Sequence, residues 1–231
     1  MHFQQLVTRW LRFYRIVAQK PVSKAPEDHN SKTYQYYQSV NPVYKTLYFD
    51  FSPNMTRTLI IFYEDSNFQG KFHESSGDCA DLHSHLTCCN SIRVENGCWV
   101  VYERPNYMGH QYYLKSGEYP NYQSWSGFND SIRSCHSIPH HHGSYRIRLY
   151  DREDFHGQMK EYINDCSNIN KSFHVSDILS CNVLEGYWIF YENPGFQGNQ
   201  YFLRPGEYRK FSEWGSLNSR VGSLKRIMDF Y

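Results

Sequence analysis

Alternation of apolar and polar positions is the main periodic signal in this chain of 231 residues. The segment 145–149, Tyr-Arg-Ile-Arg-Leu, places apolar and charged side chains at a period of two, which predicts a strand buried on one face. The segment 188–191, Trp-Ile-Phe-Tyr, is short and fully apolar, which suits a strand inside a sandwich. Short helical turns are expected in the longer connections, at 78–86 and 166–178. The pattern therefore predicts an all-β protein.

A pattern of eight residues occurs four times along the chain. Each copy begins with a tyrosine followed by an acidic residue, and it ends with an aromatic residue two positions before a glycine. Successive copies start 39, 48 and 41 residues apart, which is the length of one supersecondary unit. The four copies are Tyr63–Gly70, Tyr102–Gly109, Tyr150–Gly157 and Tyr191–Gly198.

Each copy predicts a tight folded hairpin. The glycine supplies a positive φ that a side chain resists, and the two aromatic rings are expected to stack across the fold of the hairpin. A serine follows each glycine by 21 to 25 residues, and its hydroxyl is expected to bond exposed backbone groups of the hairpin. The serines assigned to this role are Ser91, Ser131, Ser180 and Ser223.

The tryptophans indicate that the two halves of the repeat are built alike. Trp99 and Trp188 each stand three residues before the tyrosine of an even-numbered copy, and Trp125 and Trp214 each stand 23 residues after it. One pair of tryptophans is therefore expected in the core of each half. Aromatic residues are 18% of the chain, whereas alanine occurs only three times, and this composition favours strands over helices.

The Tyr-x6-Gly pattern with its trailing serine resembles the Greek-key motif of the βγ-crystallins. The segments 98–107, 127–135 and 221–231 are similar to the γ-crystallins of the eye lens in particular. The resemblance implies two domains, each a sandwich of two four-stranded antiparallel sheets built from two Greek-key motifs. The polar segment 139–144 is then the linker between a domain at 57–138 and a domain at 145–231, and residues 1–56 form an extension outside the family pattern.

The resemblance also implies an apolar patch that joins the two domains. Burial of such a set of side chains stabilises the pairing by several kcal/mol at ~25 cal/mol per Å². Carried over by aligned motif, the patch consists of Val100, Tyr113, Ile138, Ile189, Phe202 and Ile227.

Charge is divided unevenly along the chain. Residues 1–57 hold eight Lys and Arg against three Asp and Glu, whereas residues 58–231 hold sixteen against twenty. The folded part therefore has no basic excess to hold a phosphate backbone, and no binding of nucleic acid is expected. The basic and apolar segment Trp10–Val17 leaves two alternatives, an amphipathic helix on a membrane surface or a mobile tail, and Met55 is a possible true start.

Seven cysteines at irregular spacing argue against a secreted disulfide framework and favour a reduced cytosol. The adjacent Cys88 and Cys89 are either small buried apolar groups or a pair for thiol exchange.

Few side chains suggest a metal site. The run His140–His142 with His136 nearby, and the pair His83 and His85, are candidates for zinc or copper, but a solvated linker is the favoured interpretation of the run and no metal site is expected. Asn129 and Asp130 resemble part of the calcium loop of some relatives, but Arg133 stands where that loop has a hydroxyl ligand.

No catalytic motif is apparent, and neither a cofactor nor a catalytic residue is expected. The resemblance implies a soluble structural protein of the eye lens, monomeric in the cytoplasm of the fibre cell, with weak contacts to other crystallins and no membrane partner. The alternative is a calcium-binding βγ-crystallin module.

Overall fold

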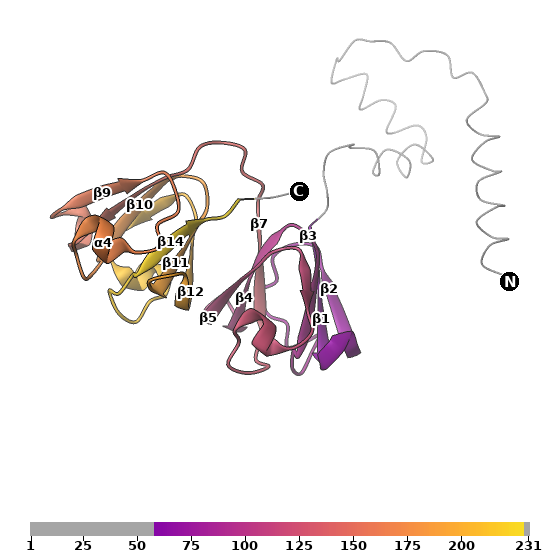
Figure 1. Ribbon diagram of the computed structural model, residues 1–231. Helices are drawn as coiled ribbons and strands as arrows, with labels where there is room; N and C mark the ends of the chain where they lie inside the picture. Colours follow the sequence, from indigo (N-terminus) through magenta and orange to yellow (C-terminus); the bar gives the residue numbers. More distant parts are fainter. Residues whose placement is uncertain (1–57, 229–231) are drawn as a thin grey trace, which may run out of the picture. The chain divides into compact units, whose positions relative to one another are not determined.

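The computed structural model describes residues 58–228 (Figure 1). The expectations for the extension at 1–56, including the helix at Trp10–Val17 and the start at Met55, lie outside these residues.

The first domain consists of seven strands and two short 3-10 helices. They are β1 (Leu59–Asp65), η1 (Ser66–Phe68), β2 (Gln69–Ser75), β3 (Ser91–Asn96), β4 (Cys98–Arg104), β5 (Met108–Leu114), β6 (Gly117–Tyr119), η2 (Tyr122–Trp125) and β7 (Ser134–Ile138).

The second domain repeats this order with one added α-helix. Its elements are β8 (Arg146–Tyr150), η3 (Glu153–Phe155), β9 (Met159–Tyr162), α4 (Ile169–Phe173), β10 (Ser180–Glu185), β11 (Trp188–Asn193), β12 (Gln197–Leu203), β13 (Gly206–Tyr208), η4 (Phe211–Trp214) and β14 (Ser223–Arg226). The strands expected at 145–149 and 188–191 are β8 and β11. Of the two expected helical turns, 166–178 contains α4, whereas 78–86 contains only a turn at 83–85.

The sheets interlock the two Greek keys of each domain. One sheet of the first domain has the order β2-β1-β3-β6. Its edge strand β6 is the third strand of the second Greek key, so the second Greek key completes the sheet that the first Greek key begins. In return, Cys79 of the first Greek key pairs with Cys135 of β7 in the other sheet. The second domain has the equivalent sheet β13-β10-β8-β9 and the equivalent bridge between Cys166 and Leu224. All strand pairs are antiparallel.

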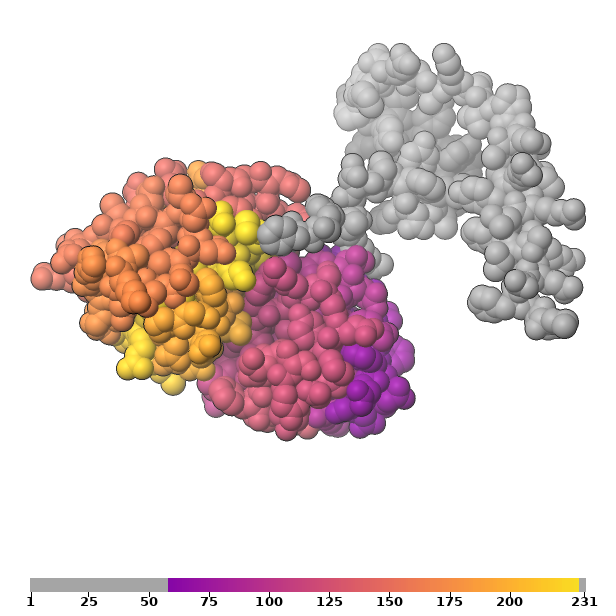
Figure 2. Space-filling view, in the orientation of Figure 1, coloured from indigo at the N-terminus to yellow at the C-terminus, as the bar shows by residue number. Residues whose placement is uncertain are grey.

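The expected fold class is confirmed, with one detail added. In each domain the fourth strand of the second sheet is reduced to a single bridge, at Cys79 or at Cys166. The remaining three strands of each domain join into one six-stranded sheet, β14-β11-β12-β5-β4-β7, through one residue pair, Gln111 and Gln200 (Figure 1). The two domains lie against each other where β5 meets β12 (Figure 2).

The core follows from the alternation along the strands. In β8 the burial pattern alternates, so that Ile147 and Leu149 are buried and the arginines between and before them are not. The all-apolar start of β11, with Trp188 and Phe190, is buried throughout because one face meets the domain core and the other meets the first domain.

Candidate functional site: folded hairpins and the interdomain cluster

The four folded hairpins have one geometry. In each, the ring of the first tyrosine meets the ring of the aromatic residue five positions later, edge to face. Ring centroids are 5.6 to 5.8 Å apart in the four pairs. This arrangement suits the quadrupoles of aromatic rings. The pairs are Tyr63–Phe68, Tyr102–Tyr107, Tyr150–Phe155 and Tyr191–Phe196.

The backbone of the hairpins is more constrained than the glycines alone suggest. The four glycines have φ of 78° to 81°, as their role in a tight bend requires. The aromatic residue of each hairpin also has a positive φ, of 61° to 63°, and so does the residue before it. That preceding residue is Asn67, Asn106, Asp154 or Gly195, and these are the residue types that enter the left-handed region most readily. An Asn, Asp or Gly before the aromatic residue is therefore a second sequence signal for the bend, besides the glycine at its end.

A buried serine holds each left-handed aromatic residue in place. In the first hairpin, the Oγ of Ser91 accepts the backbone N–H of Phe68 at 2.9 Å and donates to the carbonyl of Asp65 at 2.6 Å. Ser180 and Ser223 make the same pair of bonds to the third and fourth hairpins. One hydroxyl thus satisfies two backbone groups of a turn that cannot pair with a strand.

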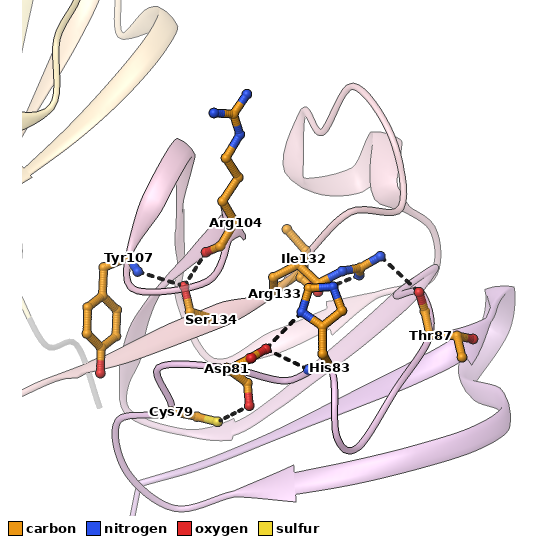
Figure 3. Close-up of polar contacts among 9 residues, drawn as sticks. All are labelled: Cys79, Asp81, His83, Thr87, Arg104, Tyr107, Ile132, Arg133 and Ser134. Atoms are coloured by element: carbon orange, nitrogen blue, oxygen red, sulfur yellow. Dashed lines mark hydrogen bonds and ion pairs between the residues drawn. The ribbon is translucent and has the colours of Figure 1, made fainter.

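In the second hairpin this serine is Ser134, so the assignment of Ser131 is wrong. Ser134 Oγ accepts the N–H of Tyr107 at 3.0 Å and donates to the carbonyl of Arg104 at 2.6 Å (Figure 3). Ser134 of β7 also lies directly opposite Tyr102 of β4. Ser91 of β3 has the same position opposite Tyr63 of β1. Ser131 lies in the loop before β7, with its N–H bonded to the side chain of Asn129.

The spacing of the fourth hairpin would have identified the right serine. Ser223 follows Gly198 by 25 residues, and Ser134 follows Gly109 by the same 25 residues. The even-numbered copies already matched in the spacing of their tryptophans, so this rule was available from the sequence.

The four tryptophans lie in the domain cores. Trp99 and Trp188 are fully buried, and each Nε1–H donates to a backbone carbonyl three residues earlier, at 3.2 and 3.1 Å. Trp125 and Trp214 are buried at the ends of η2 and η4.

A separate buried cluster joins the two domains. It contains five of the six residues assigned to the interface, whereas Tyr113 packs against its edge and is only partly buried. The Tyr113 hydroxyl donates to the thiol of Cys98 at 3.3 Å, which accounts for a phenol at this edge. Cys98, Tyr102 and Tyr191 belong to the cluster as well, and the aligned motifs did not suggest them.

Polar groups border this cluster. Each of Gln111 and Gln200 bonds a backbone N–H of the opposite domain, at 2.8 and 3.0 Å. His136 of β7 is buried, and its Nδ1 contacts a carboxylate oxygen of Asp78 at 2.6 Å while its Nε2 contacts the guanidinium of Arg204 in the second domain. His136 therefore belongs to the domain boundary and not to the histidine run at 140–142.

Burial dominates the chemistry of the titratable groups around the cores. Desolvation raises the pKa of the Cys135 thiol to about 12, with the neighbouring Cys79 adding to the shift. Burial also raises the pKa of Cys89 and of Cys181. Cys88 is half-buried, and its thiol donates to the carbonyl of Glu64 at 3.4 Å. All seven cysteines of the sequence are among the described residues, and no disulfide joins them there.

The candidate metal ligands do not converge within residues 58–228, where no group of three His, Cys, Asp or Glu side chains is placed to hold an ion. His83 contacts Asp81 at 2.8 Å (Figure 3). His85 does not pair with His83, because its ring stacks on that of His73. Nε2 of His141 contacts the carbonyl of Ser144 at 2.7 Å.

At the calcium-like loop, the guanidinium of Arg133 donates hydrogen bonds to the carbonyls of Ile132 and Thr87, each at 2.9 Å (Figure 3). The fixed positive charge of Arg133 in this loop opposes a cation there.

Together, two domains of two interlocked Greek keys and four serine-bonded hairpins define a repeat-built β-sandwich protein. The family model described as Beta/Gamma crystallin matches residues 59–138 and again residues 146–227. The chain belongs to the β/γ-crystallin family.

Several gamma-crystallins are similar to this chain over nearly their whole length. Gamma-crystallin M2 of Chiloscyllium indicum is 61% identical over 170 residues, which are 74% of this chain and 97% of that protein. Gamma-crystallin 2 of Rana temporaria is 59% identical over 167 residues, covering 72% of this chain and 99% of that protein. Gamma-crystallin B of Bos taurus is 57% identical over 172 residues, covering 74% and 98%.

Among residues 58–228, no helix has the length and apolar character that a bilayer crossing requires.

Proposed function

We propose that this chain is a structural constituent of the eye lens, a non-catalytic protein that raises refractive index by packing densely in the cytoplasm of the fibre cell. The observation that carries the proposal is the identity of 61% and 59% to gamma-crystallins across 97% and 99% of their lengths.

The composition supports an optical role in physical terms. Light is slowed more by polarizable matter, and aromatic rings, thiols and guanidinium groups are the most polarizable side chains. The chain holds 21 Tyr, 15 Phe, 5 Trp and 7 Cys. Aromatic rings fill the cores as close packing demands, for example where buried Phe190 meets buried Trp214 edge to face.

Behaviour at high concentration is the second requirement. Residues 58–231 carry a net charge of −4, from sixteen basic and twenty acidic side chains. Such near-neutral, interspersed charge gives neither strong long-range repulsion nor strong attraction. We infer a monomer that makes weak, short-range contacts with other crystallins and binds neither nucleic acid nor membrane.

The test is abundance in lens tissue together with small-angle scattering of the purified full chain at rising concentration. A lens-abundant protein whose scattering stays that of a monomer supports the proposal. Strong expression elsewhere with scarcity in lens, or growth of large assemblies on concentration, contradicts it.

The alternative is a calcium-binding role, which the positive charge of Arg133 in the calcium-like loop disfavours. Calorimetric titration of the full chain with calcium distinguishes the two. Heats that saturate at micromolar calcium would support the module, and their absence supports the structural role. The variant Arg133→Thr, which restores a hydroxyl, serves as a positive comparison because it removes the opposing charge.

A further inference from the structure

Cys79 and Cys135 lie directly opposite each other in the first domain. They form an isolated antiparallel bridge and exchange both backbone hydrogen bonds, each at 2.9 Å. Residues in such a hydrogen-bonded pair have Cα atoms about 5.5 Å apart and project their side chains from the same face of the sheet. The span that disulfides favour between Cα atoms is about 4.4–6.8 Å.

The two thiols differ in their access to solvent. Cys135 is 0% exposed within the core of the first domain, whereas Cys79 packs against the edge of that core and is only partly buried. The Cys79 thiol points toward the carbonyl of Asp81, 3.4 Å away in the loop after the bridge (Figure 3). A reagent in solution therefore reaches Cys79 first, and Cys135 is protected behind it.

The second domain offers a matched comparison. Cys166 occupies the position equivalent to Cys79, and it exchanges the same two backbone bonds with Leu224, each at 2.9 Å. Leu224 has no sulfur, so Cys166 faces no thiol across its bridge. Within the described residues, the thiol pair is thus a property of the first domain and not of the shared fold.

We propose that Cys79 and Cys135 form a reversible disulfide, with a small-molecule disulfide as the oxidant, that joins the two Greek keys of the first domain covalently. In the first step, the Cys79 thiolate attacks one sulfur of the small disulfide, whose S–S bond breaks and releases one thiolate. In the second step, Cys135 gives up its proton, which ends on the departing small thiol, and attacks the Cys79 sulfur. The mixed disulfide then breaks, and the second small thiol leaves.

This exchange transfers two electrons from the cysteine pair to the small disulfide. The two cysteine thiols are oxidised to one disulfide, and the small disulfide is reduced to two thiols. Because the Cys135 pKa is raised to about 12, its thiolate is scarce near neutral pH and the second step is the slow one. Its proximity to Cys79 gives the attack an intramolecular advantage.

The position of the pair indicates why the bond is reversible. Side chains at a hydrogen-bonded pair stand farther apart than at the neighbouring pairs of an antiparallel ladder. Closing the disulfide then requires the chain around Cys79 to move toward β7. A bond formed under such strain is more easily reduced than a relaxed one.

The experiment treats the native full chain with oxidised glutathione, alkylates the remaining thiols and maps disulfides by mass spectrometry of peptides. We expect a cross-linked peptide containing Cys79 and Cys135, a loss of two free thiols, and recovery of both on adding dithiothreitol. A cross-link of Cys88 to Cys89 without the Cys79–Cys135 peptide, or glutathione that stays on Cys79 of the wild type, overturns the proposal.

Two variants test the order of the steps. In Cys135→Ala the reaction is expected to stop at Cys79 carrying one glutathione, because no second thiol displaces it. In Cys79→Ser, at the partly exposed position, Cys135 is expected to stay unmodified, and glutathione on Cys135 would contradict the mechanism. Cys88→Ser is the control and should form the cross-link as the wild type does. Tryptophan fluorescence before oxidation verifies that each variant is folded.

Discussion

Gln111 of β5 and Gln200 of β12 lie opposite each other across the domain boundary, and each side-chain oxygen accepts a backbone N–H from the other residue's strand. The acceptor distances are 2.8 Å from the N–H of Phe202 and 3.0 Å from the N–H of Tyr113. Side-chain amides thus extend a ladder that has a single backbone pair between the domains. The pairing of the domains depends on these amides as well as on the apolar cluster.

Replacing Gln111 by alanine is therefore expected to weaken the pairing of the domains. The change leaves the Phe202 N–H without its acceptor and removes the bond to the carbonyl of Trp214, with an expected loss of about 1–3 kcal/mol in the free energy of unfolding. Urea unfolding followed by tryptophan fluorescence measures it. Gln123→Ala, at an exposed position of η2, is the control. Equal unfolding midpoints for the two variants would contradict the prediction.

The serine of the second hairpin gives a direct test of the corrected assignment. Ser134→Ala removes two hydrogen bonds and leaves the N–H of left-handed Tyr107 unpaired, which is expected to cost about 1–3 kcal/mol. Ser131→Ala is expected to change the free energy of unfolding by less than about 0.5 kcal/mol, as for other surface sites. Thermal unfolding of the pair decides between them, and a larger loss for Ser131→Ala would restore the original assignment.

The hairpin glycines are expected to resist substitution. Gly157 has φ of 78°, and an added Cβ would clash with the carboxylate of Asp151. The backbone conformation alone is expected to cost Gly157→Ala about 1–2 kcal/mol, with the steric contact adding to it. Gly77 has open space around its Cα and no positive φ, so Gly77→Ala is the matched control and should be neutral or slightly stabilising. Chemical denaturation of both variants measures the difference.

Acid is expected to weaken the first domain through Asp78. Partial burial alone would raise the pKa of this carboxyl, but hydrogen bonds from His136 and Ser137 outweigh burial and lower the pKa below its ordinary value of 3.8. A lowered pKa in the folded state means that the carboxylate stabilises the fold above pH 3.8, and that this contribution is lost as the pH falls through the folded-state value.

The measurement is the urea midpoint of wild type and Asp78→Asn from about pH 5 down to about pH 2. The wild type is expected to lose more stability over this range than the variant, because the variant lacks the titrating group. Parallel curves for the two proteins would contradict the assignment of this pH dependence to Asp78.

The all-β class, the four hairpins and the two halves could be predicted from the sequence because the determining residues recur at fixed distances, and the resemblance to the γ-crystallins implied the Greek-key sandwich. Four Tyr-x6-Gly copies and two matched tryptophan pairs specified the hairpins, the two halves and the core, and the aligned motifs placed Ile138, Phe202 and Ile227 at the domain boundary. The hairpins and the two halves depend on local spacing or on repetition, which a single sequence displays, whereas the boundary residues were implied by the resemblance to the γ-crystallins.

Features that arise from pairing between distant segments were missed. Ser131 and Ser134 both follow Gly109 within the loose range of 21 to 25 residues, and they are distinguished by the matched spacing of the fourth copy and by the register of β4 against β7. His136 looked like part of a histidine run because its neighbours in sequence are histidines, whereas the alternation of β7 turns it toward Arg204. The contact of Cys79 with Cys135 spans two Greek keys, and no local pattern indicates it.

The exchange of third strands sets the smallest unit of this chain that can fold by itself. Residues 58–96 alone would leave β3 without its neighbour β6, and Cys79 without β7. Their open sheet edge would invite pairing with another chain. A stable fragment must therefore end between the domains, near 139–145, and a cut between two Greek keys of one domain yields two pieces that regain structure only by reassociating. Proteolysis within 96–98 is accordingly more damaging than cleavage in the linker.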